Sequence, residues 1–281
     1  MNWWCFYRPK HFGVLALLAL YALPAFAVFP QPNSPTVLIT GANASHGLAF
    51  AEEYAALGWN VIATCRSPEA ADELNALAAA NSNVQVEQLD IVDDTEIAAL
   101  AEKLQNVPID VLLNNAAINA YRFGIDRFGK IDYEFFEKIL VVNIIGQLKV
   151  SEAFQANVEA SAQKKIISMT STGGSITNTE VPINIGYSAS KAGLNMAMRN
   201  YSIHLRNKGV IVGIIAPGTV DTHDYMNAKD PDTVPRNYKV MMKMGRLVPR
   251  TAINDMIELI DGLALEDSGI YYQWDGEVLP W

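Results

Sequence analysis

Tyr187 and Lys191 stand four positions apart in the run Gly-Tyr-Ser-Ala-Ser-Lys at residues 186–191. In a helix, side chains at this spacing lie on the same face. A lysine cation beside a phenol favours the phenolate, so a group with an ordinary pKa of about 10 could exchange protons near neutral pH. The pair is therefore a candidate general acid-base, although a tyrosine and a lysine at this spacing are more commonly an ordinary surface pair.

A glycine-containing turn lies upstream, between an apolar run and a helical pattern. Thr36–Thr40 has the composition of a buried parallel strand, and the segment from Gly41 to Gly47 follows it directly. A helix is predicted over Leu48–Leu57. Strand, turn and helix N-terminus together direct free amides and the positive end of the helix dipole at a pyrophosphate. A lone glycine-rich turn is often only a turn, but this setting favours nucleotide binding.

The end of the next predicted strand bears on the choice of cofactor. That strand, Asn60–Thr64, is followed by Cys65 and Arg66 rather than by a carboxylate. An Asp or Glu there would accept hydrogen bonds from an adenosine ribose, whereas Arg66 favours a 2′-phosphate. We therefore expect NADP(H) as the preferred cofactor, with NAD(H) as the alternative.

Strand and helix patterns alternate along the rest of the chain. Further strands are predicted at Val84–Leu89, Val111–Asn114, Lys165–Thr170, Val210–Ile215 and Ile270–Trp274, with helical patterns such as Pro68–Ala80, Asp94–Leu104 and Tyr133–Ala156 between them. This alternation predicts one α/β domain over residues 34–281, of the Rossmann type, with a doubly wound, seven-stranded parallel sheet. Ligands of such sheets bind beyond the carboxyl ends of the strands.

Several motifs in order resemble the short-chain dehydrogenase/reductase family over most of Thr36–Trp281. They are the turn from Thr40 to Gly47, Asp90 with Ile91, the Asn114-Asn115-Ala116-Ala117 turn, Asn143, Ser171, the pair Tyr187 and Lys191, and Pro217-Gly218 with Thr222. The resemblance implies that the catalytic residues are Asn143, Ser171, Tyr187 and Lys191. It implies that the cofactor contacts are Gly41, Asn43, Ser45, His46, Gly47, Arg66, Asp90, Ile91, Asn115, Ala116, Tyr187, Lys191, Pro217, Gly218, Val220 and Thr222.

Within that family, the chain is most similar to the C-factor and sniffer-like carbonyl reductases. The similarity rests on the run from Ile62 to Ala70 and on the terminal run Trp274–Trp281. Two positions depart from the family pattern, because Ser45 and Ala117 stand where glycines are usual. Glycine permits positive φ and a close approach to phosphate, so we expect weakened rather than abolished cofactor binding.

The resemblance implies an NADP-dependent oxidoreductase that moves a hydride between nicotinamide and a carbonyl or secondary alcohol. Tyr187 would supply the proton, and Ser171 would hydrogen-bond the same oxygen. Lys191 would lower the pKa of Tyr187 and bind the nicotinamide ribose, and Asn143 would hold a relay water. The partners are then a small carbonyl or alcohol and, as an alternative to a monomer, a second copy in a homodimer. The rival hypothesis is a nucleotide-binding signalling or scaffold protein without turnover, because fold does not fix function.

Residues 221–246 resemble the family least. In the family this region covers the substrate, and methionines adapt well to irregular apolar ligands. We predict a substrate-covering loop; the alternative is that its methionines face the core or a membrane. The residues that suggest it are Tyr225, Met226, Met241, Met242 and Met244.

Composition excludes several other classes. With 281 residues and 50% hydrophobic content, the chain can form one sizeable core. A net charge of −9 and the absence of a basic cluster argue against nucleic acid as a partner. The four histidines are scattered, so no metal site is predicted. Two cysteines cannot form a disulfide framework.

Residues 1–30 do not fit the domain pattern. Arg8 and Lys10 precede an apolar run that ends at Ala25-Phe26-Ala27, a small-x-small sequence before Val28. This pattern is typical of a cleaved secretory signal, and residues 12–29 are also just long enough for a membrane anchor; a misplaced start codon is the third alternative. The positive residues before the run favour an exported or lumenal domain, and a cytoplasmic-facing anchor is the alternative.

Overall fold

The computed structural model describes Met1 and residues 29–119, 128–180 and 184–281. Within these residues, seven strands form a parallel sheet in the order β3-β2-β1-β4-β5-β6-β9. The strands are β1 (Thr36–Thr40), β2 (Asn60–Cys65), β3 (Val84–Gln88), β4 (Val111–Asn114), β5 (Lys165–Met169), β6 (Ile211–Ala216) and β9 (Tyr271–Gln273). Each strand lies within one residue of its predicted ends, so the single Rossmann-type domain is confirmed.

The strands form where the sequence has short apolar and β-branched runs, because both faces of the sheet are covered. Strands β1, β2, β4, β5 and β6 are buried along their whole length. Leu38 of β1 pairs with Ile62 on one side and with Leu112 on the other. A continuous apolar run is what a central parallel strand requires, whereas a half-exposed strand would alternate.

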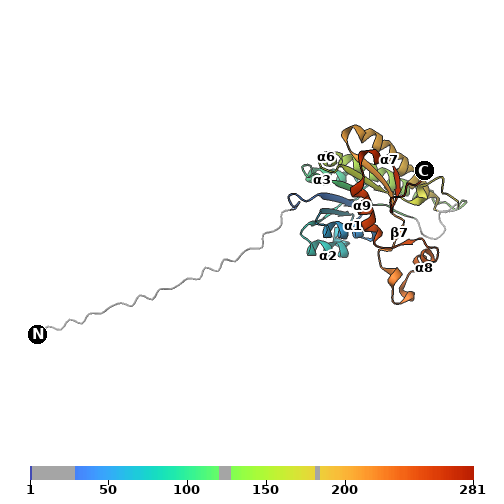
Figure 1. Ribbon diagram of the computed structural model, residues 1–281, viewed down its shortest axis with the longest axis horizontal. Helices are drawn as coiled ribbons and strands as arrows, with labels where there is room; N and C mark the ends of the chain where they lie inside the picture. Colours follow the sequence, from blue (N-terminus) through green and yellow to red (C-terminus); the bar gives the residue numbers. More distant parts are fainter. Residues whose placement is uncertain (2–28, 120–127, 181–183) are drawn as a thin grey trace.

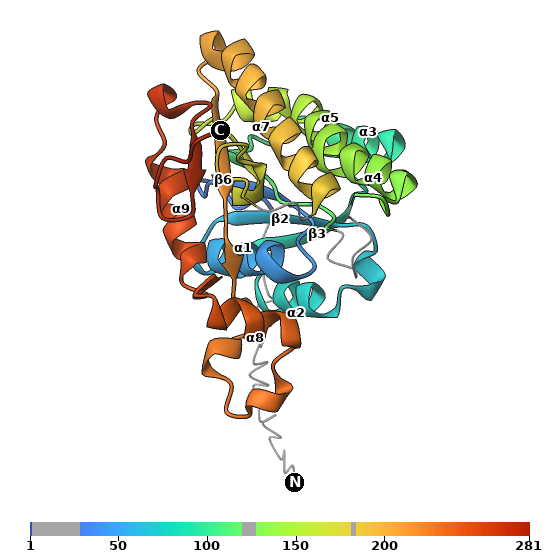
Figure 2. The same ribbon diagram turned by 90° about the vertical axis from the view of Figure 1, so that its right-hand side faces the viewer.

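Two layers of helices enclose the sheet (Figures 1 and 2). One core cluster joins the sheet to α1 (Ser45–Ala56), α2 (Asp72–Ala80) and α9 (Ala252–Gly262). The other joins it to α3 (Asp94–Lys103), α5 (Gln147–Ala153) and α7 (Ile185–Leu205). Short 3-10 turns complete the connections: η1 (Pro68–Ala70), η3 (Thr172–Gly174), η4 (Arg206–Lys208) and η7 (Leu265–Asp267).

The prediction of one continuous helix over residues 133–156 is wrong. The structure has α4 (Tyr133–Leu140), a π-helical segment η2 (Val141–Gly146), α5, and α6 (Gln155–Glu159). The π segment contains Asn143, whose buried amide bonds the backbone of Ile118 in the loop after β4. Single π turns inside helices are common at functional sites. The interruption therefore coincides with a contact that an ordinary amphipathic pattern does not encode.

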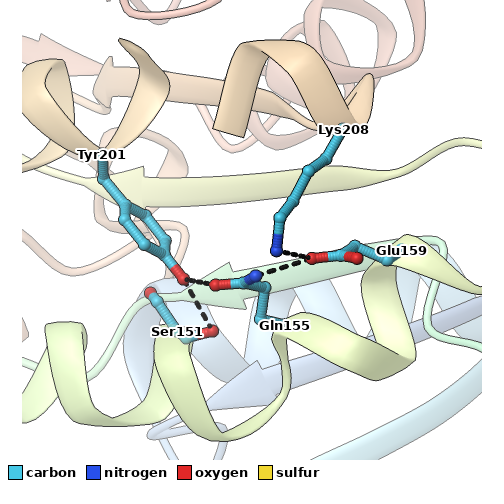
Figure 3. A network of polar contacts seen from close by, with 5 residues as sticks. All are labelled: Ser151, Gln155, Glu159, Tyr201 and Lys208. Atoms are coloured by element: carbon cyan, nitrogen blue, oxygen red, sulfur yellow. Dashed lines mark hydrogen bonds and ion pairs between the residues drawn. The ribbon is translucent and has the colours of Figure 1, made fainter. Parts of the chain in front are cut away.

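A polar network fixes α7 against α5 and α6, as Figure 3 shows. The Tyr201 hydroxyl donates its single hydrogen to the Gln155 side chain at 2.8 Å, with the Ser151 carbonyl as a second, more distant acceptor at 3.3 Å. Gln155 in turn donates to Glu159 at 2.6 Å, and Lys208 pairs with the same carboxylate at 2.8 Å. The ion pair is partly exposed and contributes little by itself. The network mainly fixes the register of α7, the helix that carries Tyr187 and Lys191.

Residues 221–246 form a separate lobe at one end of the domain, coloured orange in Figures 1 and 2. The lobe contains η5 (Tyr225–Asn227), η6 (Pro231–Thr233) and α8 (Arg236–Lys243). Its base is a two-stranded parallel sheet of β7 (Thr219–Val220) and β8 (Leu247–Val248). The buried carboxylate of Asp221 accepts hydrogen bonds from the backbone of Tyr225 and Met226, which fixes the entrance to the lobe.

The predicted signal or anchor in residues 1–30 lies almost entirely outside the described residues, and the apolar stretch 12–29 does so except for Phe29. Among the residues that the structure describes, no helix has the length and apolar character needed to span a bilayer. Phe29 packs on the core, and the Gln31 backbone N–H donates to Asn60 at 2.7 Å.

Candidate functional site

A cavity of about 1520 Å³ opens at the carboxyl ends of the sheet strands. It includes loops that follow β1 and β4, the point at which the chain reverses its direction of winding and where such sheets bind ligands. Most of the residues predicted from sequence line it: Gly41, Asn43, Ser45, His46, Arg66, Asp90, Ile91, Asn115, Ala116, Ser171, Tyr187, Lys191, Pro217 and Gly218. Gly47, Asn143, Val220 and Thr222 are not among its lining residues.

The turn after β1 requires glycine at two positions. Gly41 has φ +65°, and a Cβ there would lie 3.0 Å from the Ala116 Cα. A Cβ on Gly47 would lie 2.2 Å from the Gly41 carbonyl oxygen, so this glycine lets α1 approach the turn closely. Helix α1 has no side-chain cap at Ala44 and no acidic residue in its first turn. Its N-terminal amides and positive dipole are therefore suited to an anion.

The two departures from the glycine pattern differ in cost. Ser45 has φ +52°, in the left-handed region where a side chain is strained, so the position does favour glycine. Its hydroxyl lies 3.2 Å from His46 Nδ1. Ala117 is not among the residues with positive φ, so glycine is not required there by the backbone.

The turns after β1 and β4 are tied together by hydrogen bonds. The Thr40 hydroxyl accepts from the backbone amides of Asn115 and Ala116, each at 3.0 Å. The Asn115 side chain donates to the carbonyls of Thr40 and Gly41, at 3.0 and 3.1 Å. Asn115 therefore shapes the predicted phosphate turn as well as lining the cavity.

His46 lies at the same end of the cavity. Burial is the main cause that lowers its pKa, and the positive charge of Arg250 is the second; with a pKa of about 4 the imidazole is uncharged near neutral pH. Arg250 is itself paired with Glu52 at 2.6 Å and Glu53 at 3.4 Å, which joins the start of α9 to α1.

Tyr187 and Lys191 project from the first turns of α7 into the same wall, as the sequence spacing predicts. Lys191 Nζ lies 5.6 Å from the centre of the Tyr187 ring and donates to the Met169 carbonyl at 2.8 Å. The side chain of Lys191 is 1% exposed. Burial lowers its pKa from 10.5 to about 7, so both the charged and the neutral form are populated near neutral pH.

Ser171 follows β5 and lines the cavity beside this pair. Its Oγ accepts a hydrogen bond from the Gly173 backbone at 3.1 Å. With one lone pair used in this way, the hydroxyl hydrogen remains suited to donation toward an oxygen in the cavity. The Ser171 carbonyl accepts from Gly174 N at 2.8 Å, which closes the η3 turn.

Asn143 is fully buried and holds elements of the site in place. Its amide nitrogen donates to the Ile118 carbonyl and to Ser190 Oγ, both at 3.0 Å, and its oxygen accepts from Ile118 N at 2.8 Å. Both amide hydrogens are thus used within the protein, and the side chain connects the loop after β4 to α7. The relay water stays a prediction.

Several cavity residues were not predicted as site residues from the sequence. They come from the loop after η3, from α8 and the turn that follows it, and from the segment after β9, and include Asn178, Glu180, Tyr238, Arg246 and Trp274. Tyr238 and Met241 are three positions apart on α8, a helical spacing that could have indicated a shared face. Met242 and Met244 are instead exposed.

Comparison with known proteins agrees with this geometry. Residues 35–233 match the short chain dehydrogenase family, and the chain belongs to it. An uncharacterized oxidoreductase of Schizosaccharomyces pombe is 28% identical over 86% of this chain and 96% of its own length. The C-signal protein of Myxococcus xanthus is 29% identical over 65% of this chain and 99% of its own.

Among solved structures, the NADPH-bound carbonyl reductase from chicken fatty liver superposes with a TM-score of 0.75. It is 28% identical, and the match covers 88% of this chain and 99% of that one. The predicted membership of the short-chain dehydrogenase/reductase family, near carbonyl reductases and C-signal, is therefore confirmed. The protein is an oxidoreductase of this family.

Proposed function

We propose that this protein is an NADP(H)-dependent oxidoreductase that interconverts a small carbonyl compound and its secondary alcohol. The observation that carries the proposal is one cavity with Ser171, Tyr187 and Lys191 on its wall and the glycine turn and Arg66 on its lining. The rival role without turnover is not favoured, because a scaffold has no need of a buried lysine held beside a phenol at a ligand cavity.

The residues present fit a dinucleotide. The close approach of Gly41 and Gly47 and the uncapped start of α1 suit a pyrophosphate, and Arg66 suits a 2′-phosphate. The chicken carbonyl reductase that superposes on this chain is NADPH bound, which supports the same cofactor here. When bound, the nicotinamide supplies or accepts the hydride.

The protein's own part of the reaction is to hold the substrate oxygen and move a proton. Tyr187 would donate its hydroxyl proton to the developing alkoxide, and Ser171 would hydrogen-bond the same oxygen. The Lys191 ammonium would favour the phenolate that Tyr187 becomes. Asn143 would keep the loop after β4 and α7 in register around them.

The lobe of residues 221–246 would cover the substrate. Its support is that Tyr238 and Met241 of α8 line the cavity from the lobe side. A thioether and an aromatic ring favour a largely apolar substrate body attached to the reacting carbonyl.

Turnover tests the proposal directly. Protein comprising residues 28–281 would be incubated with NADPH and a panel of ketones, aldehydes and quinones, and oxidation would be followed through the loss of reduced nicotinamide absorbance. We expect at least one carbonyl class to be reduced, with apolar members preferred. NADPH binding without turnover of any member would instead favour the signalling or scaffold role.

Lys191 should make NADPH binding depend on pH. Without cofactor its pKa is about 7 because of burial. The negative charge of a bound nucleotide would raise that pKa. At pH values between the pKa of the free protein and that of the complex, binding therefore takes up a proton. In that window the Kd should increase by up to about tenfold per pH unit. Fluorescence titrations from about pH 6 to 9 measure this effect. Lys191→Met should bind more weakly with a flatter profile, and a constant wild-type Kd would contradict the prediction.

We expect the N-terminal segment to be either a cleaved signal or an uncleaved membrane anchor, with the domain outside the cytoplasm; a cytoplasmic-facing anchor is the alternative. The support is the order of Arg8 and Lys10, the apolar run and Ala25-Phe26-Ala27. Mass spectrometry of natively expressed protein should detect an N-terminal peptide that begins at Val28, or Met1 in the membrane fraction only. Protease protection of the domain in intact vesicles then reports its side. Met1 in the soluble fraction would contradict both alternatives.

A further inference from the structure

The carbonyl of Ser171 has a second hydrogen-bond donor from a distant part of the chain. Tyr271 Oη of β9 donates to it at 2.5 Å, across 100 positions of sequence. The Tyr271 side chain is 1% exposed. Burial raises its pKa to about 12, so the hydroxyl stays protonated and remains a donor through the neutral pH range.

Trp281 connects Tyr271 to Thr177, six positions further along the loop that begins at Ser171. Its ring stacks on Tyr271, with centroids 5.5 Å apart and planes inclined by 26°. Its backbone oxygen accepts from Thr177 twice, from the amide at 2.9 Å and from Oγ1 at 2.6 Å. The loop is therefore held at Ser171 by the Tyr271 hydroxyl and at Thr177 by Trp281.

Polar contacts from Asn195 of α7 hold the same loop at two further residues. Asn195 Oδ1 accepts from the Thr170 hydroxyl at 2.6 Å, and its amide donates to the Gly174 carbonyl at 3.4 Å. Tyr271 and Asn195 together restrict Ser171, because its own carbonyl, the Thr170 hydroxyl and the Gly174 carbonyl each bond a buried side chain.

We propose that Tyr271 and Trp281 are positioning residues that fix the Ser171 hydroxyl for its hydrogen bond to the substrate oxygen. The inference rests on the proposed carbonyl reduction and adds two residues that are not among the predicted catalytic or cofactor-binding residues. A hydrogen-bond donor in an active site is effective only when it is held at the point where charge develops, so its backbone anchor affects turnover more than substrate binding.

The neighbouring tyrosine provides a matched control. Tyr272 belongs to the core cluster on the opposite face of the sheet from Tyr271, and its hydroxyl bonds Asp267 at 3.0 Å. Tyr271→Phe and Tyr272→Phe each remove one hydrogen-bonded hydroxyl from the same strand. We expect Tyr271→Phe to lower kcat about 5- to 10-fold with KM for NADPH unchanged, and Tyr272→Phe to leave kcat within about twofold.

A double-mutant cycle tests whether Tyr271 acts through Ser171. In a Ser171→Ala background, Tyr271→Phe should lower the remaining kcat by less than about twofold, because the hydroxyl it positions is already gone. Trp281→Ala, at a residue that is 45% exposed, should lower kcat about 3-fold without loss of folded protein.

The outcomes separate this inference from the proposed function. If wild-type protein reduces carbonyls but Tyr271→Phe equals Tyr272→Phe, or if its effect is fully additive with Ser171→Ala, the positioning role is wrong and the function stands. If wild-type protein turns over no carbonyl, the proposed function fails first. A melting temperature lowered equally in both phenylalanine variants, with kcat lowered only in Tyr271→Phe, supports the inference.

Discussion

Tyr187→Phe is expected to lower carbonyl reduction by at least about 100-fold while NADPH still binds. The substitution removes only the hydroxyl and leaves the ring beside Lys191, whose Nζ lies 5.6 Å from its centre. Without that hydroxyl, the developing alkoxide has no positioned proton donor, so the barrier rises at the chemical step. Steady-state kcat with the best substrate of the panel, together with NADPH fluorescence titration, measures both effects.

The control for this variant is a tyrosine away from the cavity. Tyr133, at the start of α4, is 74% exposed, and Tyr133→Phe should keep kcat within about twofold. Near-normal turnover in Tyr187→Phe would rule out the acid-base assignment. A loss of NADPH binding along with turnover would show instead that the tyrosine acts mainly in holding the cofactor.

Much of the fold could be predicted because its determinants are local. A buried parallel strand needs a short apolar run, and such runs mark β1 through β6 and β9 within one residue. The interruption at Val141–Gly146 was missed because it coincides with a tertiary contact, the Asn143 amide on the Ile118 backbone. Helical periodicity alone contains no information about such a partner.

The candidate site likewise has features that the sequence predicts and features that depend on tertiary contacts. The spacing of Tyr187 and Lys191 and the family resemblance at Ser171 predicted these three residues, and all three line the same cavity. The degree of burial of Lys191, which lowers its pKa to about 7, depends on how β5 and α7 pack. The hydrogen bond from Tyr271 to the Ser171 carbonyl spans 100 positions and joins a side chain to a backbone oxygen, so no local pattern predicts it.

Arg66→Ala is expected to weaken NADPH binding about 10- to 150-fold and to spare NADH. Arg66 is exposed, follows β2 and lines the cavity, and no ion pair involves it within the part of the chain that the structure describes. A guanidinium on a 2′-phosphate forms charge-assisted hydrogen bonds worth about 1.5 to 3 kcal/mol. NADH lacks that phosphate, so its affinity should change by less than about twofold. Titration of the same preparations with both cofactors gives the two ratios.

Two further variants sharpen the interpretation of Arg66. Arg206→Ala removes an exposed arginine that does not line the cavity, and it should leave both affinities unchanged, which controls for overall charge. Arg66→Lys keeps the charge but loses the planar fork, so it should recover only part of the NADPH affinity. Equal losses for NADPH and NADH in Arg66→Ala would make the residue structural. A wild-type preference for NADH would overturn the NADP(H) assignment itself, because a bound 2′-phosphate is the only feature that Arg66 is expected to distinguish.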